Sequence, residues 1–219
     1  RKRLVYEGLA RVLANIHTTD AASVMATLGA SIPEITSKSF CLRQVKIWGE
    51  QYNQSVVNNE RVAAMDALGK WLLQNAPEDK PGVKCPVSVL HGDFRLDNVI
   101  YAEDDSAKIK AVLDWELSSV GNPLADLAYC CLGYYLPPKG FLSSFSLLTT
   151  DPASVSRHRV PDGIPSVEQF VECYRQEVAS SGGTGHAFAV PNVDSKEWCY
   201  YLSLGLFRIG AICAGVYAR

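Results

Sequence analysis

Two neighbouring stretches decide the fold, LHGDFRLDNVIY at residues 90–101 and VLDWELSSVGNPLADLAY at residues 112–129. Each places carboxylates at the ends of short apolar runs of the kind that form buried strands. A desolvated Asp is costly when nothing of opposite charge or suitable polarity faces it. The sequence therefore predicts a partner opposite these carboxylates, and a metal ion would supply one.

The composition describes an ordinary globular chain. Its 219 residues are 47% apolar and 20% charged, with a net charge of −2, and are numerous enough to bury a substantial core. Scattered Lys and Arg and an isoelectric point near 6.1 argue against a nucleic-acid partner. Seven Cys without a CxxC pair favour a reducing, intracellular compartment, without distinguishing peroxisome, mitochondrion or cytoplasm.

The most apolar stretches lie around residues 127–138 and 198–216. They are interrupted by Pro137 and Pro138 or by Arg208, and neither reaches the ~20 residues of a membrane span. No transmembrane segment is therefore expected.

Apolar spacing predicts a mostly helical α+β chain with a small central β insert. We expect a loop over 139–165, a flexible link over 180–186, and a last helix capped by Asp194 with Glu197 completing a capping box. Helices are predicted over 3–17, 40–57, 59–75, 124–135 and 166–179, and strands over 87–91, 98–101 and 110–115.

The β insert carries the chemistry. Asp93 and Asn98 are five residues apart, as in the protein-kinase pattern H-R-D-L-x-x-x-N, and Asp114 follows the next strand, where kinases place a metal-binding Asp. Amide and carboxylate oxygens suit Mg²⁺ held together with substrate phosphates, and the remaining Asp can take a proton from an attacking hydroxyl. The pattern predicts phosphoryl transfer that depends on ATP and Mg²⁺.

The blocks HGDFRLDN (91–98), LDWE (113–116) and GNPLADLA (121–128) resemble the signature of the aminoglycoside-phosphotransferase-like kinases. This resemblance implies a protein-kinase-like large C-terminal lobe. Residues 43–52 and 163–174 further resemble the kinase-like domain at the N-terminus of long acyl-CoA dehydrogenase proteins.

The resemblance also implies roles for individual residues. Asp93 would be the catalytic base, and Asn98 and Asp114 would hold Mg²⁺. His91 and Asp126 would support the catalytic loop.

For other side chains, a functional role and a structural role are both considered. Arg95 and Glu116 are candidates to contact substrate, phosphate or the metal's waters. Trp198 and Tyr201 occur at a spacing that favours core packing, although they could line an acceptor pocket. His17 closes an apolar helix face and is interpreted as a packed or capping residue.

Residues 1–219 are interpreted as one lobe, with the catalytic loop at 90–101 and the metal-binding segment at 112–128. Kinases also need a small lobe with a Gly-rich loop and a Lys paired with a Glu. Only 92 residues precede Asp93, they read as helices, and GGTGH at 182–186 follows no strand. We therefore expect the large lobe without its N-terminal lobe, and an inactive isolated chain.

The function expected from the resemblance is a small-molecule kinase acting on a hydroxyl, with a hydroxyacyl-CoA as the implied acceptor. An aminoglycoside, a sugar or a choline-like alcohol is an alternative acceptor. The expected partners are ATP, the acceptor, the missing lobe and a covalently linked acyl-CoA dehydrogenase domain. The alternative from another class is a non-catalytic module that binds a partner or a further domain.

Overall fold

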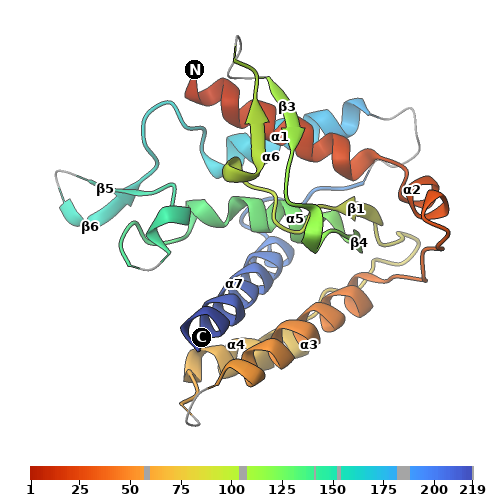
Figure 1. Ribbon diagram of the computed structural model, residues 1–219, viewed down its shortest axis with the longest axis horizontal. Helices are drawn as coiled ribbons and strands as arrows, with labels where there is room; N and C mark the ends of the chain where they lie inside the picture. The colour runs from red at the N-terminus through yellow and green to blue at the C-terminus, as the bar shows by residue number, and fades with distance from the viewer. Residues whose placement is uncertain (57–59, 104–107, 141, 152–153, 182–187, 219) are drawn as a thin grey trace.

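The computed structural model describes residues 1–56, 60–103, 108–140, 142–151, 154–181 and 188–218. α-Helices dominate these residues (Figure 1), as the sequence predicts. Their bounds are α1 Lys2–Thr18, α2 Ala21–Thr27, α3 Ser37–Ser55, α4 Ala63–Gln74, α5 Pro123–Cys130, α6 Val167–Ser180 and α7 Lys196–Tyr217. Short 3₁₀ turns are η1 Leu96–Asn98, η2 Trp115–Leu117, η3 Cys131–Tyr134 and η4 Ser143–Phe145.

The strands form antiparallel pairs, β1 with β4, β2 with β3 and β5 with β6. Their bounds are β1 Ser88–Leu90, β2 Val99–Tyr101, β3 Ile109–Val112, β4 Ser119–Gly121, β5 Thr149–Asp151 and β6 Ser154–Arg159. The predicted central insert thus consists of two ribbons, β1–β4 and β2–β3, in place of one continuous sheet.

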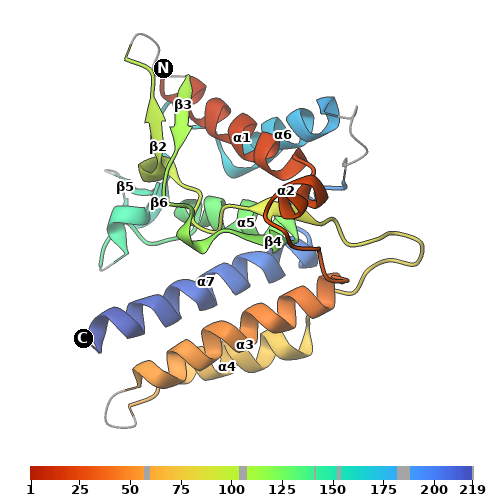
Figure 2. The ribbon, with the colours of Figure 1, turned by 45° about the vertical axis from the view of Figure 1, so that its right-hand side comes forward.

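Two helical layers enclose the β1–β4 ribbon and α5 (Figure 2). Helices α3, α4 and α7 pack against one another on one side, and α1 packs against α6 on the other. The β2–β3 hairpin projects beside the N-terminal end of α1. The segment from β1 to α5, which carries all the predicted site residues, therefore runs between the two layers.

Helix α5 begins where the sequence demands it. The Asn122 side chain accepts a hydrogen bond from the Leu124 backbone N–H at 2.9 Å, and Pro123 occupies the first helical position. Asn122 is buried and also donates to the Tyr201 hydroxyl at 2.8 Å, which ties the start of α5 to α7.

Two local predictions are wrong, and one helix was not predicted. The last helix is capped by Ser195, whose Oγ accepts from the Trp198 N–H at 3.1 Å, so the cap lies one residue beyond Asp194 and the predicted box with Glu197 does not form. Helix α2 was not predicted, although Asp20 caps it. The stretch 139–165 contains the β5–β6 hairpin as well as loop, and the predicted link lies largely outside the described residues, at 182–186.

Helix α7 corrects the expectation that no apolar stretch of the chain is as long as a membrane span. At 22 residues it is, by length and composition alone, long and apolar enough to cross a membrane. It packs as a core helix against α3 and α5, and Trp198 and Tyr201 are fully buried in it. Their core-packing interpretation therefore holds, because neither side chain is open to an acceptor.

Candidate active site

The loop after β1 is held by one carboxylate. Asp126 of α5 accepts hydrogen bonds from the backbone N–H groups of His91 at 2.7 Å and Gly92 at 3.0 Å, and it is only 3% exposed. The chain turns at Gly92, where φ is 86°, and Asp93 follows. The structure thus places His91 and Asp126 where the sequence predicts support for the catalytic loop.

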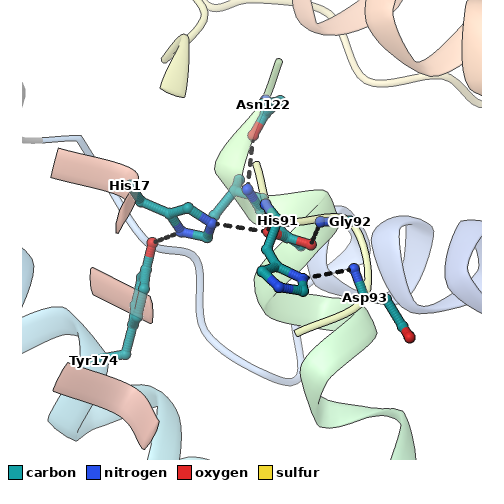
Figure 3. A network of polar contacts seen from close by, with 8 residues as sticks. His17, His91, Gly92, Asp93, Asn122 and Tyr174 are labelled. Atoms are coloured by element: carbon teal, nitrogen blue, oxygen red, sulfur yellow. Dashed lines mark hydrogen bonds and ion pairs between the residues drawn. The ribbon is translucent and has the colours of Figure 1, made fainter. Parts of the chain in front are cut away.

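His17 of α1 completes this support (Figure 3). Its Nε2 lies 3.2 Å from Asp126 Oδ2, and its Nδ1 lies 2.7 Å from the Tyr174 hydroxyl of α6. Burial by itself would raise the pKa of Asp126, but His17 and the two backbone N–H groups outweigh it and lower that pKa. We call His17, His91, Gly92, Asp126 and Tyr174 the buried cradle.

The loop is also fixed against the segment that carries Asp114. The His91 ring nitrogen Nε2 lies 2.8 Å from the Leu113 carbonyl oxygen, and the rings of His91 and Trp115 have centroids 4.7 Å apart. A Cβ on Gly92 would lie 2.3 Å from the Leu117 carbonyl oxygen, so only glycine fits here. The two predicted motif segments therefore form one interlocked site.

Asp93 is partly buried at the centre of the site. Asn98, brought back by the η1 turn, donates from Nδ2 to the Asp93 backbone oxygen at 2.8 Å and to its Oδ2 at 3.0 Å. The Arg95 Nε lies 3.6 Å from the same Oδ2, while its guanidinium stacks on Phe145 at 4.5 Å from the ring centroid. The Tyr129 phenol also lies beside this carboxylate, which adds to the effect of burial in raising the pKa of Tyr129.

The two predicted metal ligands flank paired strands, Asn98 just before β2 and Asp114 shortly after β3. Val99 pairs with Val112 across the β2–β3 hairpin, and the Leu113 N–H donates to the Asn98 backbone oxygen at 2.8 Å, so Asp114 lies one residue beyond this bond. Asp114 adopts a left-handed conformation with φ of 65°, and its exposed carboxylate has no hydrogen bond or ion pair to any residue that the structure describes.

These donors fit Mg²⁺. Because the Asn98 amide nitrogen donates to Asp93, its Oδ1 is left as an oxygen donor at the start of β2, and the paired strand β3 leads to Asp114. Within the described ranges, no group of three or more His, Cys, Asp and Glu could form a closed metal cage. One carboxylate and one amide suit an ion that takes its remaining ligands from phosphate and water.

Glu116 is not brought into this arrangement. It lies in the exposed η2 turn and makes no hydrogen bond or ion pair within the described part of the chain. Tyr129 of α5 was not predicted, but it belongs to the site because it lies near Asp93. Burial raises the pKa of Tyr129 to about 12. Arg208 opposes that rise, and Asp93 adds to it. The signal for it was its position in α5, one turn beyond Asp126.

A model of the phosphotransferase enzyme family matches residues 1–145. Acyl-CoA dehydrogenase family member 10 from Mus musculus is 33% identical over 220 residues, a match that covers the whole chain and 17% of that protein. Family member 11 from the same species is 32% identical over 219 residues, covering 98% of the chain and 24% of that protein. The chain therefore spans less than a quarter of the length of these relatives.

A solved structure agrees with the sequence matches. A protein from Ralstonia eutropha JMP134, assigned to the aminoglycoside phosphotransferases, superposes with a TM-score of 0.71 at 29% identity, covering 99% of this chain and 56% of that one. With its protein-kinase-like lobe and its three motif blocks in order, the chain belongs to the phosphotransferase enzyme family of aminoglycoside-phosphotransferase-like kinases.

Proposed function

We propose that the protein containing this chain transfers the γ-phosphoryl group of ATP, with Mg²⁺, to a hydroxyl of a small molecule. The observation that carries the proposal is the Asp93 carboxylate, which Asn98 orients through its amide nitrogen. The Asn98 backbone oxygen is in turn bonded to Leu113, the residue before Asp114. Such a base next to two hard oxygen ligands is the arrangement that phosphoryl transfer to an alcohol requires.

The chemistry follows from these positions. The acceptor hydroxyl donates a hydrogen bond to Asp93, its oxygen forms a bond to the γ-phosphorus, and the bond from that phosphorus to the ADP oxygen breaks. The hydroxyl proton passes to Asp93 as the new bond forms. Mg²⁺ neutralises charge on the phosphates when bound, and the cradle keeps Asp93 in place throughout.

The relatives are named as acyl-CoA dehydrogenase family members. On that ground we propose a linked acyl-CoA dehydrogenase domain and, as the acceptor, an acyl-CoA that carries a hydroxyl. Phosphate is a better leaving group than the hydroxide that an unmodified hydroxyl would have to release, so phosphorylation would prepare such a compound for elimination. The small lobe that closes over ATP is part of the same proposal. The reaction therefore has to be assayed in the full-length protein.

The decisive substitution is Asp93→Asn. Asn keeps the shape of the side chain but cannot take the proton, so turnover should fall by roughly 10²–10⁴ while ATP affinity stays nearly unchanged. Release of ADP with a panel of hydroxyacyl-CoAs and titration of ATP measure the two quantities.

Asp97→Asn is the matched control, because Asp97 is a neighbouring carboxylate whose side chain is 69% exposed. It should retain wild-type turnover. Equal ADP release by wild type and Asp93→Asn would contradict catalysis and favour the alternative of a module that only binds a partner.

A further inference from the structure

Arg208, in the middle of α7, has a guanidinium group that lies among aromatic rings. Its guanidinium carbon lies 4.8 Å from the ring centroid of Trp48 in α3 and 4.4 Å from that of Tyr129 in α5. Its Nε and Nη2 are shielded from solvent, and among the described residues they have no hydrogen-bond partner and Arg208 has no ion pair. Arg stays protonated in proteins, so unmade hydrogen bonds here are costly unless a ligand makes them.

Arg208 lines a pocket of about 370 Å³ between α3, α5 and α7. Figure 2 shows α7 between α5, which lies beside β4, and α3. Trp48, Gly92, Leu117 and Tyr129 also line it. The Asp126 carboxylate is the acidic group among the described lining residues, and its oxygens are already bonded within the buried cradle. No acidic side chain of the described lining therefore neutralises Arg208.

The pocket reaches the catalytic loop. Gly92, which precedes Asp93, forms part of its wall. The Tyr129 phenol lies near both ends of the pocket, because its pKa, raised mainly by burial, is lowered by Arg208 and raised further by Asp93. A small molecule in this pocket can thus have one end at the guanidinium and a hydroxyl at the catalytic loop. Trp48 is itself held by its indole N–H, which donates to Gln44 at 3.2 Å, so this aromatic wall of the pocket is fixed.

We infer that Arg208 binds an anionic group of the phosphoryl acceptor and so selects negatively charged hydroxy compounds. The inference rests on the proposed kinase function and narrows its substrate class. The anion is the carboxylate of a hydroxy acid or a phosphate of a CoA ester, which offer the same hydrogen-bonding chemistry to a guanidinium. Cationic acceptors such as aminoglycosides or choline-like alcohols are disfavoured, because they would bring a second positive charge to Arg208.

The test, in the full-length protein, compares acids with amides of the same size, which differ in charge, and adds CoA esters that carry phosphates. The probes are 2-, 3- and 4-hydroxybutanoate, their neutral amides, and the matching hydroxybutanoyl-CoA esters. Arg208→Met should lower kcat/KM for the anionic acceptors about 10- to 100-fold, mainly through KM, and leave the amides nearly unchanged. Arg208→Lys should restore part of the preference, since it restores the charge without the planar fork.

Arg43→Met is the control variant. Arg43 also lies over an aromatic ring of α3, that of Phe40 at 5.8 Å, but it is exposed and does not line the pocket. It should leave all acceptors unaffected. An equal loss for acids and amides in Arg208→Met, or a wild type that uses both equally, would overturn the inference and leave Arg208 a packing residue.

Calorimetric binding of the same probes separates this inference from the kinase proposal. Binding of an anionic probe that is weakened by Arg208→Met, without ADP release from any acceptor, would support the anion site and contradict the kinase. Turnover that does not depend on Arg208 would support the kinase proposal and contradict the anion site. A response confined to the CoA esters would assign the anion to a phosphate, and a response of the free acids would assign it to the carboxylate. If Arg208→Met fails to fold, the acid-to-amide ratio of wild type and Arg208→Lys decides.

Discussion

The two halves of the site, the buried cradle and the segment at residues 113–117, differ in burial and in how many of their polar groups are hydrogen-bonded. In the buried cradle, His17 and His91 are fully buried and every polar group named above has a hydrogen-bond partner. The facing segment at residues 113–117 is open: Leu113 is 45% exposed, Trp115 41% and Leu117 42%, and the Asp114 carboxylate is unpaired among the described residues. The fold thus orders the loop around Asp93 in advance, whereas the segment around Asp114 is left open.

This difference predicts different consequences for substitutions. A change in the cradle removes hydrogen bonds from groups that water cannot reach, so it should appear in the free energy of unfolding. A change in the exposed segment removes a group that water solvates, so it should appear in ligand binding.

The largest effect is expected for Asp126→Asn. Asparagine has the same shape, but its NH₂ would face backbone N–H donors or His17, so the cradle would lose both charge and hydrogen bonds. The free energy of unfolding should fall by about 3–5 kcal/mol. Urea denaturation of the 219-residue chain measures it, and a loss below about 1 kcal/mol would show that the cradle is not the stable half of the site.

Gly92→Ala should be next in size. Its Cβ would meet the Leu117 carbonyl oxygen at 2.3 Å, which forces the loop and the facing segment apart. We expect a loss of about 2–4 kcal/mol in unfolding free energy, within the range of severe single substitutions.

Gly29→Ala is the matched control for this clash. Gly29 also has a positive φ, 69°, but no atom lies within 4 Å of the position its Cβ would take. It should lose only the left-handed strain of about 1–2 kcal/mol. If both variants lose the same amount, the interlock between the two halves contributes nothing to stability.

Acid should weaken the cradle selectively. The pKa of Asp126 is lowered from its ordinary value of 3.8, so its contribution is present above pH 3.8 and is lost as the pH falls through the lower folded pKa. The gap in unfolding free energy between wild type and Asp126→Asn should therefore be full at pH 6 and narrow below pH 3.8. Denaturation curves at pH 6, 4 and 3 test this, and a gap that widens in acid would contradict it.

Spacing alone predicted the parts of the site that are local in the chain, and the family resemblance added His91 and Asp126 as support for the loop. Asp93 and Asn98 are joined by a single 3₁₀ turn, so their spacing alone brings them together. The cradle depends on contacts across 109 residues, from His17 to Asp126, and across 157, from His17 to Tyr174, which no local pattern contains. For the same reason, Arg208 was visible only as an interruption of an apolar stretch.

The capping error has a different origin. Asp194 and Ser195 are adjacent and both are good N-cap residues, so the sequence allowed either start for α7. The packing of Trp198 in the core selects Ser195. The catalytic and metal-binding roles of Asp93, Asn98 and Asp114 remain predictions, because geometry shows where these residues lie and not what they do.

The smallest change in stability is expected for Asp114→Asn, and it gives the sharpest contrast with Asp126→Asn. Asn tolerates the left-handed conformation found at this position, and the carboxylate that it replaces is exposed and unpaired among the described residues, so the free energy of unfolding should change by less than about 0.5 kcal/mol. The same substitution should abolish the tightening of ATP binding by Mg²⁺ in the full-length protein, because it removes the one charged oxygen donor of the proposed metal site. Isothermal titration of ATP with and without Mg²⁺, for wild type and variant, measures this, and Asp97→Asn should behave as wild type. A variant that keeps the Mg²⁺ effect would exclude Asp114 from the metal site. One that unfolds as readily as Asp126→Asn would show that the exposed segment is as much a part of the folded framework as the cradle, and the distinction between the two halves would fail.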